Sequence, residues 1–147
     1  MTSRVYWVKP PSIMVPALNQ YQQKLLLAIY AVAAYVGQAM QDDARRKAKW
    51  EDRTGNARSG VFFAVDGFGI APITGAVGDI SVDSSGRGQA DQAVISGTSD
   101  RLVLALSHTM YYGKYLELSN GGRYAIIIST MQAHVPQLER MLKALLR

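Results

Sequence analysis

The spacing of apolar residues predicts one long helix over residues 17–50. This segment contains no proline and a single glycine, Gly37. Its larger apolar side chains recur at intervals of three, four and seven residues, which places them along one side of a helix. They are Leu18, Tyr21, Leu25, Ile29, Val32 and Val36. With a rise of about 1.5 Å per residue, such a helix would be about 50 Å long, more than a small domain needs.

The last part of this segment is charged rather than apolar. Asp42 precedes Arg46, and Asp43 precedes Lys47, by four residues. Acid before base at this spacing is the favourable order for ion pairs on a helix. Acidic residues alternate here with the basic ones, which limits the positive potential around Trp50. The segment is therefore interpreted as a solvated helix face or as a charged contact surface.

Residues 1–16 are predicted to form an extended arm. They include three prolines, and each proline removes a backbone donor and restricts the residue before it. Four apolar side chains on this arm need a surface to cover them, namely Tyr6, Trp7, Ile13 and Met14. Two alternatives stay open: the arm folds back on its own domain, or it reaches another subunit.

Residues 61–109 change in character to a glycine-rich, β-branched sequence typical of strands and tight turns. Four strands are predicted, over residues 61–65, 70–82, 93–97 and 101–109. The sequence GTSD, residues 97–100, predicts a tight turn before the last strand. Residues 83–92 are polar and carry Arg87, so they are expected either to be a plain connection or to form the tip of a long hairpin that makes contacts.

The remainder predicts a helix over residues 110–118, a short strand over residues 123–129 and a closing helix. Asn120 or Gly121 is expected to take the left-handed conformation that ends the first of these helices. Pro136 is tolerated best near a helix start, so the closing helix is expected to begin near His134. The fold class is therefore α+β: after the arm, residues 17–147 form a single domain in which a long N-terminal and a C-terminal helix pack on an antiparallel β-sheet.

Composition and charge exclude several classes of protein. The chain has 147 residues, 48% of them hydrophobic, which suffices for one globular domain. It has no cysteine and two histidines, so no metal or cofactor is expected. Ser107 and His108 are adjacent, and adjacent side chains on a strand point to opposite faces, so an enzyme is not expected. An enzyme would need Ser107, His108, Asp66 or Glu117 to converge in one pocket.

The chain is expected to stay in a cytoplasm and outside membranes. Its N-terminus lacks the apolar centre of a signal peptide. The longest nearly apolar run, residues 25–37, is shorter than the roughly 20 residues that cross a bilayer. The net charge of +5 fits nucleic acid, an acidic partner or solubility alone, and does not choose among them.

Residues 111–126, YYGKYLELSNGGRYAI, combine four tyrosines with one glutamate and a glycine pair. Tyrosine buries a large area at low entropic cost while keeping a polar tip, which suits a surface that is partly dry and partly wet. Two interpretations can coexist. In one, the segment is a subunit or partner interface that includes Tyr112, Tyr115, Glu117, Arg123 and Tyr124. In the other, it is an internal elbow whose tyrosines seal the core while Glu117 binds backbone.

These motifs, in this order, resemble the tail-completion or neck proteins of long-tailed bacteriophages. The family has a TG.L..S step after its first helix, which is matched loosely by Thr54, Gly55, Arg58 and Ser59, with Ala57 where leucine is usual. Its YG.YLE.G step before the last helix is matched closely by residues 112–117. AIIIST stands in place of the usual PF..PA run. The resemblance spans about residues 20 to 145.

The resemblance implies a structural virion protein made in the host cytoplasm. Copies would form a ring, expected to be hexameric, between the head connector or stopper and the tail terminator or tail tube. DNA would pass through the channel, where Arg87 is a possible contact. Two alternatives stay open: the tail terminator ring, and a small basic nucleic-acid-binding protein with salt-sensitive duplex binding.

Overall fold

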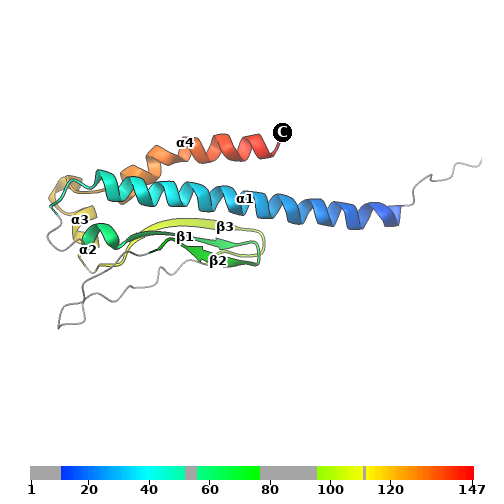
Figure 1. The fold of residues 1–147 in the computed structure, drawn as a ribbon, viewed down its shortest axis with the longest axis horizontal. Coiled ribbons are helices and arrows are strands. Elements are labelled where there is room, and N and C mark those ends of the chain that lie inside the picture. Colours follow the sequence, from blue (N-terminus) through cyan, green and yellow to red (C-terminus); the bar gives the residue numbers. More distant parts are fainter. Residues whose placement is uncertain (1–10, 52–55, 77–95, 111) are drawn as a thin grey trace, which may run out of the picture.

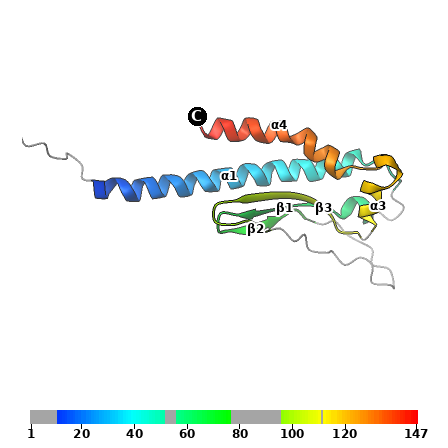
Figure 2. The same ribbon diagram turned by 180° about the vertical axis from the view of Figure 1, so that it is seen from behind.

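Three layers make up the fold, with the longest helix in the middle (Figure 1). This computed structural model describes residues 11–51, 56–76, 96–110 and 112–147. Helix α1 has the sheet on one side and helix α4 on the other, as both views show (Figures 1 and 2). The helices are α1 (Pro11–Lys47), α2 (Asn56–Ser59), α3 (Gly113–Leu118) and α4 (Ile127–Leu145), with a 3-10 turn η1 (Asn120–Gly122). The strands are β1 (Val61–Gly67), β2 (Ile70–Thr74) and β3 (Leu102–His108).

The sheet is antiparallel, with strand order β2-β1-β3. Strand β1 begins opposite His108 and ends opposite Leu102. Phe68 and Gly69 form the two-residue turn to β2, and both have positive φ, as the favoured hairpin turns require. The α+β prediction is therefore confirmed for the described part of the chain. Strand β2 ends at Thr74, and residues 77–95, with most of the expected hairpin and Arg87, lie outside the described residues.

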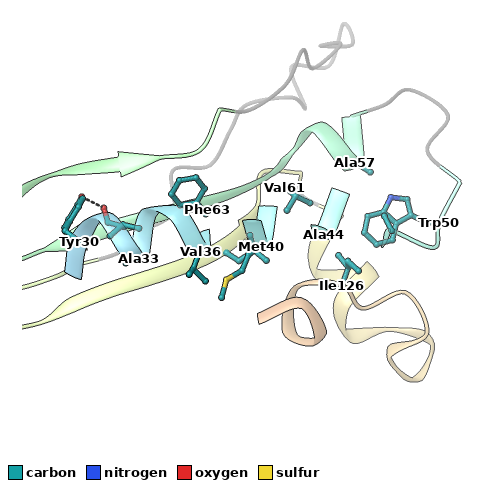
Figure 3. Packing of buried hydrophobic residues seen from close by; sticks show 13 residues of the cluster. Tyr30, Ala33, Val36, Met40, Ala44, Trp50, Ala57, Val61, Phe63 and Ile126 are labelled. Atoms are coloured by element: carbon teal, nitrogen blue, oxygen red, sulfur yellow. Dashed lines mark hydrogen bonds between the residues drawn. The ribbon is translucent and has the colours of Figure 1, made fainter. Parts of the chain in front are cut away.

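The core lies between α1 and the sheet (Figure 3). Successive turns of α1 bury Tyr30, Ala33, Val36, Met40 and Ala44. They pack with Val61, Phe63 and Val65 of β1 in one apolar cluster. The Tyr30 hydroxyl lies 2.9 Å from the Val65 carbonyl oxygen and 2.8 Å from that of Ala71, so this side chain joins α1 to two strands.

Gly37 explains how closely α1 approaches the sheet. A Cβ atom at this position would lie 2.5 Å from a ring carbon of Phe63 and 2.9 Å from a methyl carbon of Leu104. Real Cβ atoms do not approach other atoms so closely, so the only glycine of α1 is required for packing rather than for flexibility.

Two predicted boundaries of α1 are wrong. The helix begins at Pro11, so residues 11–16 are helical and the extended arm can include at most residues 1–10, which lie outside the described part. Pro16 lies inside the helix, where it removes the bond to the Ser12 carbonyl. Ser12 is exposed, so solvent can satisfy that carbonyl. The helix ends at Lys47, three residues before the predicted end.

The last part of the chain also differs from its prediction. Residues 123–126 are not a strand, and α4 begins at Ile127 rather than near His134. Pro136 lies inside α4, where it removes the bond to the Gln132 carbonyl, and both residues are on the exposed side of the helix. The left-handed stop after α3 is confirmed, since Asn120, Gly121 and Gly122 all have positive φ.

The fourth predicted strand is confirmed as β3, and the tight turn before it is confirmed too. Thr98 and Arg101 exchange backbone hydrogen bonds of 2.9 and 3.3 Å across that turn. Ser96 and Gly97 are not in a strand, and residues 93–95 lie outside the described residues.

By length and composition α1 could cross a membrane, since its most apolar stretch has a mean hydropathy of 1.2. The core helix of a soluble protein meets the same criterion. Here a third of that stretch is buried inside the fold, against the sheet and α4.

Candidate subunit interface

The N-terminal part of α1 extends beyond both neighbouring layers (Figures 1 and 2). Every residue from 12 to 24 is exposed, and we call this segment the overhang. Large apolar side chains cover much of it: Ile13, Met14, Val15, Leu18 and Tyr21 are 55–65% exposed. Surface residues this apolar are common singly, but a group of them on one helix indicates a contact surface.

The overhang carries a row of side chains at alternating intervals of four and three residues. Met14, Leu18, Tyr21 and Leu25 form this row, which we call the seam. Its spacing keeps all four on one side of α1. The same side continues through Ala28 and Val32 to Asp43, which contacts His134 of α4. The seam is therefore the uncovered continuation of the side that α4 covers further along.

Glu117 organises the elbow between α3 and α4. Its Oε1 atom accepts hydrogen bonds from the backbone N–H groups of Ile126, at 2.7 Å, and Ile127, at 2.8 Å. These groups begin α4, and the residue at the cap position, Ile126, has no side-chain acceptor of its own. A carboxylate also interacts favourably with the positive end of the helix dipole. The expectation that Glu117 binds backbone is confirmed.

The tyrosines of the elbow divide between the core and the surface. Tyr112 and Tyr124 are half-buried against the core cluster. The Tyr112 ring lies 6.1 Å from that of His108. Tyr115 is 56% exposed, so the expectation that it seals the core is wrong. The exposed Arg123 guanidinium lies 5.8 Å from the centre of the Tyr124 ring, within the range of a cation–π contact.

Tyr115 belongs to a second exposed apolar group. The Lys114 ammonium lies 5.0 Å from the centre of its ring. Leu118, one turn further along α3, is 76% exposed, and Ile128 in the first turn of α4 is 53% exposed. The elbow lies at the end of the fold opposite the overhang (Figure 1). The structure thus places the predicted interface residues in two separate groups, and Tyr6 and Trp7 lie outside the described residues.

Asp43 is buried and joins α1 to α4 through a cluster that also contains two exposed cationic side chains. Its carboxylate lies 2.7 Å from Lys47 Nζ, 2.6 Å from Arg46 Nη2 and 3.3 Å from His134 Nε2. The hydrogen bonds from Lys47 and then from Arg46 hold the pKa of Asp43 well below its usual range. The predicted pair of Asp43 with Lys47 is confirmed. Arg46 pairs with Asp43 rather than with Asp42, whose carboxylate accepts a bond from Gln38 instead.

Two other polar residues near the end of α1 point into the fold. Arg45 donates to the carbonyl groups of Ser59 and Val61 at 2.8–3.1 Å, and burial lowers the pKa of its guanidinium. The Gln41 side chain is buried and accepts a 3.0 Å bond from the Phe63 N–H. The segment is therefore not a fully solvated face, because Gln41, Asp43 and Arg45 hold α1 against the sheet and α4.

A hollow of about 420 Å³ lies beside this cluster, at the start of α4. Its wall includes the cationic side chains of Lys47, Lys49 and Arg123, together with Asp43. Lys47 is paired with Asp43, and all three cationic side chains are exposed to solvent. The hollow is weakly basic.

The four residues that an enzyme would need do not converge. His108 lies opposite Val61 at the start of β1, and Asp66 lies near the other end of that strand. Five residues of strand separate the two positions by about 16 Å. The Asp66 carboxylate accepts a bond from the Gly97 N–H, and Glu117 is held by α4. Within the described ranges, no three histidine, aspartate or glutamate side chains form a group that could hold a metal ion.

Comparisons of the chain with models of protein families, with curated proteins and with solved structures found no match. The sequence motifs and the geometry of the two exposed apolar groups are therefore the basis for assigning a function.

Proposed function

We propose that this chain is a structural protein of a bacteriophage neck, whose copies form a ring that completes the tail end and joins it to the head connector. The observation that carries the proposal is the pair of exposed apolar groups, the overhang and the elbow, at opposite ends of one subunit. A ring subunit needs two contact surfaces, one toward each neighbour. The elbow also contains the motif that resembles the tail-completion family.

Electron microscopy of the negatively stained protein, alone and mixed with isolated phage tails, tests the proposal. Rings, and attachment of the protein to one end of the tail, are the expected result. A protein that forms no ring and binds no tail would contradict it. Mass spectrometry of purified virions of the phage that encodes the chain gives the same decision independently, since a neck protein is retained in the particle.

Tyr115→Ala sharpens this test, because the side chain is exposed and its loss leaves the core intact. We expect the variant to melt within about 2 °C of the wild type and to lose rings. Tyr35→Ala is the matched control, since Tyr35 is 61% exposed on α1, away from the elbow. Equal ring formation by both variants would remove the elbow from the interface.

A second candidate function is binding of duplex DNA, which the basic residues of the hollow favour. Binding there would weaken steeply with salt, because each contact to a phosphate releases counterions. Lys49→Glu and Arg123→Glu would each weaken it further. Duplex binding by a protein that forms no rings would favour this candidate.

The tail terminator alternative is a variant of the ring proposal. It would place the ring directly on the tail tube.

A further inference from the structure

The hollow at the start of α4 gathers cationic side chains from three parts of the chain. Lys47 ends α1, Lys49 follows it closely, and Arg123 follows the turn η1. All three are exposed, and within the described ranges neither Lys49 nor Arg123 has an ion-pair partner. Asp43 is the one acidic residue of the described wall, and Lys47 and Arg46 already pair with it. The wall therefore carries a net positive charge.

One residue of the wall is buried and has a hydroxyl group without a partner. Thr130, in the first turn of α4, is 4% exposed. Its hydroxyl group makes no hydrogen bond to a described residue and is not fully covered by protein, so it opens to the hollow. The neighbouring Ser129 hydroxyl, in contrast, lies 3.2 Å from the Ile126 carbonyl oxygen. A buried polar group that lacks a protein partner needs water or a ligand.

The start of α4 adds to the positive character of the hollow. The first N–H groups of a helix have no acceptor within it, and together they form the positive end of its dipole. Glu117 accepts two of these groups, those of Ile126 and Ile127, and is not part of the described wall. The N–H groups of Ile128 and Ser129 come next, and they are left to water or to a second anion.

A phosphate group at the end of a molecule fits these features better than the backbone of a duplex. A phosphomonoester carries about two negative charges at neutral pH and has three strong acceptor oxygens. A duplex presents single charges along its length, and a row of cations would match them. Here the cations converge on one hollow of about 420 Å³, a volume in the range of small-molecule sites.

We propose that the hollow binds a terminal phosphate group. Lys49 and Arg123 pair with the phosphate oxygens, and the Thr130 hydroxyl donates a hydrogen bond to one of them. Lys47 shares its ammonium group between Asp43 and the phosphate. A nucleotide and the phosphorylated end of a DNA strand both carry such a group. The site uses the same basic residues as the second candidate function but takes a different ligand, and it does not rest on ring formation.

The hollow and the exposed apolar group of the elbow lie on different sides of α4. The α4 side of the wall is formed by residues three and four positions apart, which lie on one side of a helix. They are Ile126, Ser129, Thr130 and Ala133. Ile128 is two positions from Ile126 and from Thr130, so it lies on the opposite side. A neighbouring copy that covers the exposed apolar group therefore leaves the hollow open.

Nuclear magnetic resonance of the isotope-labelled full chain locates the site. Deoxyadenosine monophosphate is expected to shift the amide signals of Arg123, Ser129 and Thr130 in a saturable way. Deoxyadenosine, which lacks the phosphate, is the matched ligand and should leave these signals in place at the same concentrations. The dissociation constant follows from the shifts.

Lys49→Ala and Arg123→Ala are each expected to weaken binding of the monophosphate at least about fivefold, because each removes a charge-assisted contact. Lys114→Ala is the matched control, since it removes the same charge from α3, outside the described wall. It should change the dissociation constant less than about twofold. Thr130→Val keeps the shape of the side chain, so it should weaken binding about threefold or more without lowering the melting temperature.

Two short single strands of one sequence, with and without a terminal phosphate, distinguish the two sources of this group. Both sources predict tighter binding of the phosphorylated strand. If that strand binds at least about tenfold tighter than the monophosphate, the ligand is a DNA end. If the phosphorylated strand and the monophosphate bind equally, the ligand is a nucleotide.

Three results would overturn the inference: no shift of the wall signals with the monophosphate, equal binding of the two strands, or equal effects of Lys49→Ala and Lys114→Ala. Binding of a duplex that does not depend on terminal phosphates would also overturn it, in favour of the second candidate function. Ring formation and attachment to tails are measured separately, so failure of this site and failure of the virion proposal can be told apart.

Discussion

A single carboxylate defines the elbow at the residue scale. Glu117 accepts the first backbone N–H groups of α4, which have no acceptor in their own helix. Its position nine and ten residues before those groups depends on the left-handed residues between α3 and α4, which reverse the chain. The elbow is therefore a structural feature as well as a candidate contact surface, and substitutions there need separate readouts for stability and association.

Glu117→Ala is expected to lower the free energy of unfolding by about 1–3 kcal/mol, because two N–H groups lose their acceptor. Urea unfolding followed by circular dichroism measures the change. Glu139→Ala is the matched control, since Glu139 is exposed on α4 and lies 3.9 Å from Lys143, a surface pair of little expected worth. If both substitutions cost the same, the capping role of Glu117 is wrong.

Asp43 is expected to make the fold sensitive to acid. Its pKa is lowered in the folded chain, so the unfolded chain takes up a proton at higher pH than the folded one. The stabilisation is complete well above the ordinary aspartate pKa of about 4 and is lost as pH falls through and below that value. Urea midpoints measured between pH 7 and pH 3 should fall less steeply for Asp43→Asn than for the wild type.

Asp42→Asn is the control for this pH dependence, because Asp42 is an exposed neighbour bonded to Gln38. Its midpoints should follow those of the wild type. A wild-type slope that persists in Asp43→Asn would assign the acid sensitivity to another group.

At the scale of elements, the contact between α1 and β1 gives a test in which two effects oppose each other. Helix propensity alone predicts that Gly37→Ala stabilises α1 by about 1 kcal/mol. The Cβ atom would overlap the Phe63 ring, and overpacking of a core costs about 1–3 kcal/mol. We expect a net loss of stability in urea unfolding. In a Phe63→Leu background the loss should shrink, and an unchanged loss would contradict the overlap.

The elements that could be predicted from the sequence are those whose patterns are local. The apolar periodicity of α1 and the short apolar runs of β1 and β3 identified them. The start of α4 could not be found this way, because Ile126, Ile127 and Ile128 favour a strand by propensity. Capping by Glu117 and burial of Ile126 override that preference, and both depend on contacts made only in the folded chain.

At the scale of the whole molecule, the overhang should contribute to association rather than to the stability of the domain. Within α1, deletion of residues 1–16 removes residues 12–16, all of which are exposed. We expect the melting temperature to change by less than about 2 °C, measured at a concentration where the chain is monomeric. Sedimentation should show weaker association. A deletion that lowers the melting temperature as clearly as it weakens association would contradict this prediction.

Deletion of residues 1–10 alone is the matched comparison, since it keeps Met14 in the seam. Association retained by this shorter deletion would assign the contact to the helical overhang. Association lost by it would assign the contact to the segment that contains Tyr6 and Trp7.

The candidate interface was only partly predictable from the sequence. Periodicity shows which side of α1 is apolar, and it marked Leu18, Tyr21 and Leu25. It cannot show where along α1 the packing of α4 ends, because that point depends on the lengths of the two helices and on how they are aligned. The sequence does not distinguish Tyr115 from Tyr112. Only the fold places Tyr115 at the surface and Tyr112 against the core.

The isolated position of Lys24 makes the overhang open to proteolysis by trypsin. It is the only residue between positions 11 and 44 after which trypsin cleaves. A helical segment of about a dozen residues that packs on no other described element unwinds readily and so admits the protease. Cleavage after Lys24 should therefore be rapid in dilute solution and slow where neighbouring copies shield the segment, so a peptide mass reports the occupancy of this surface.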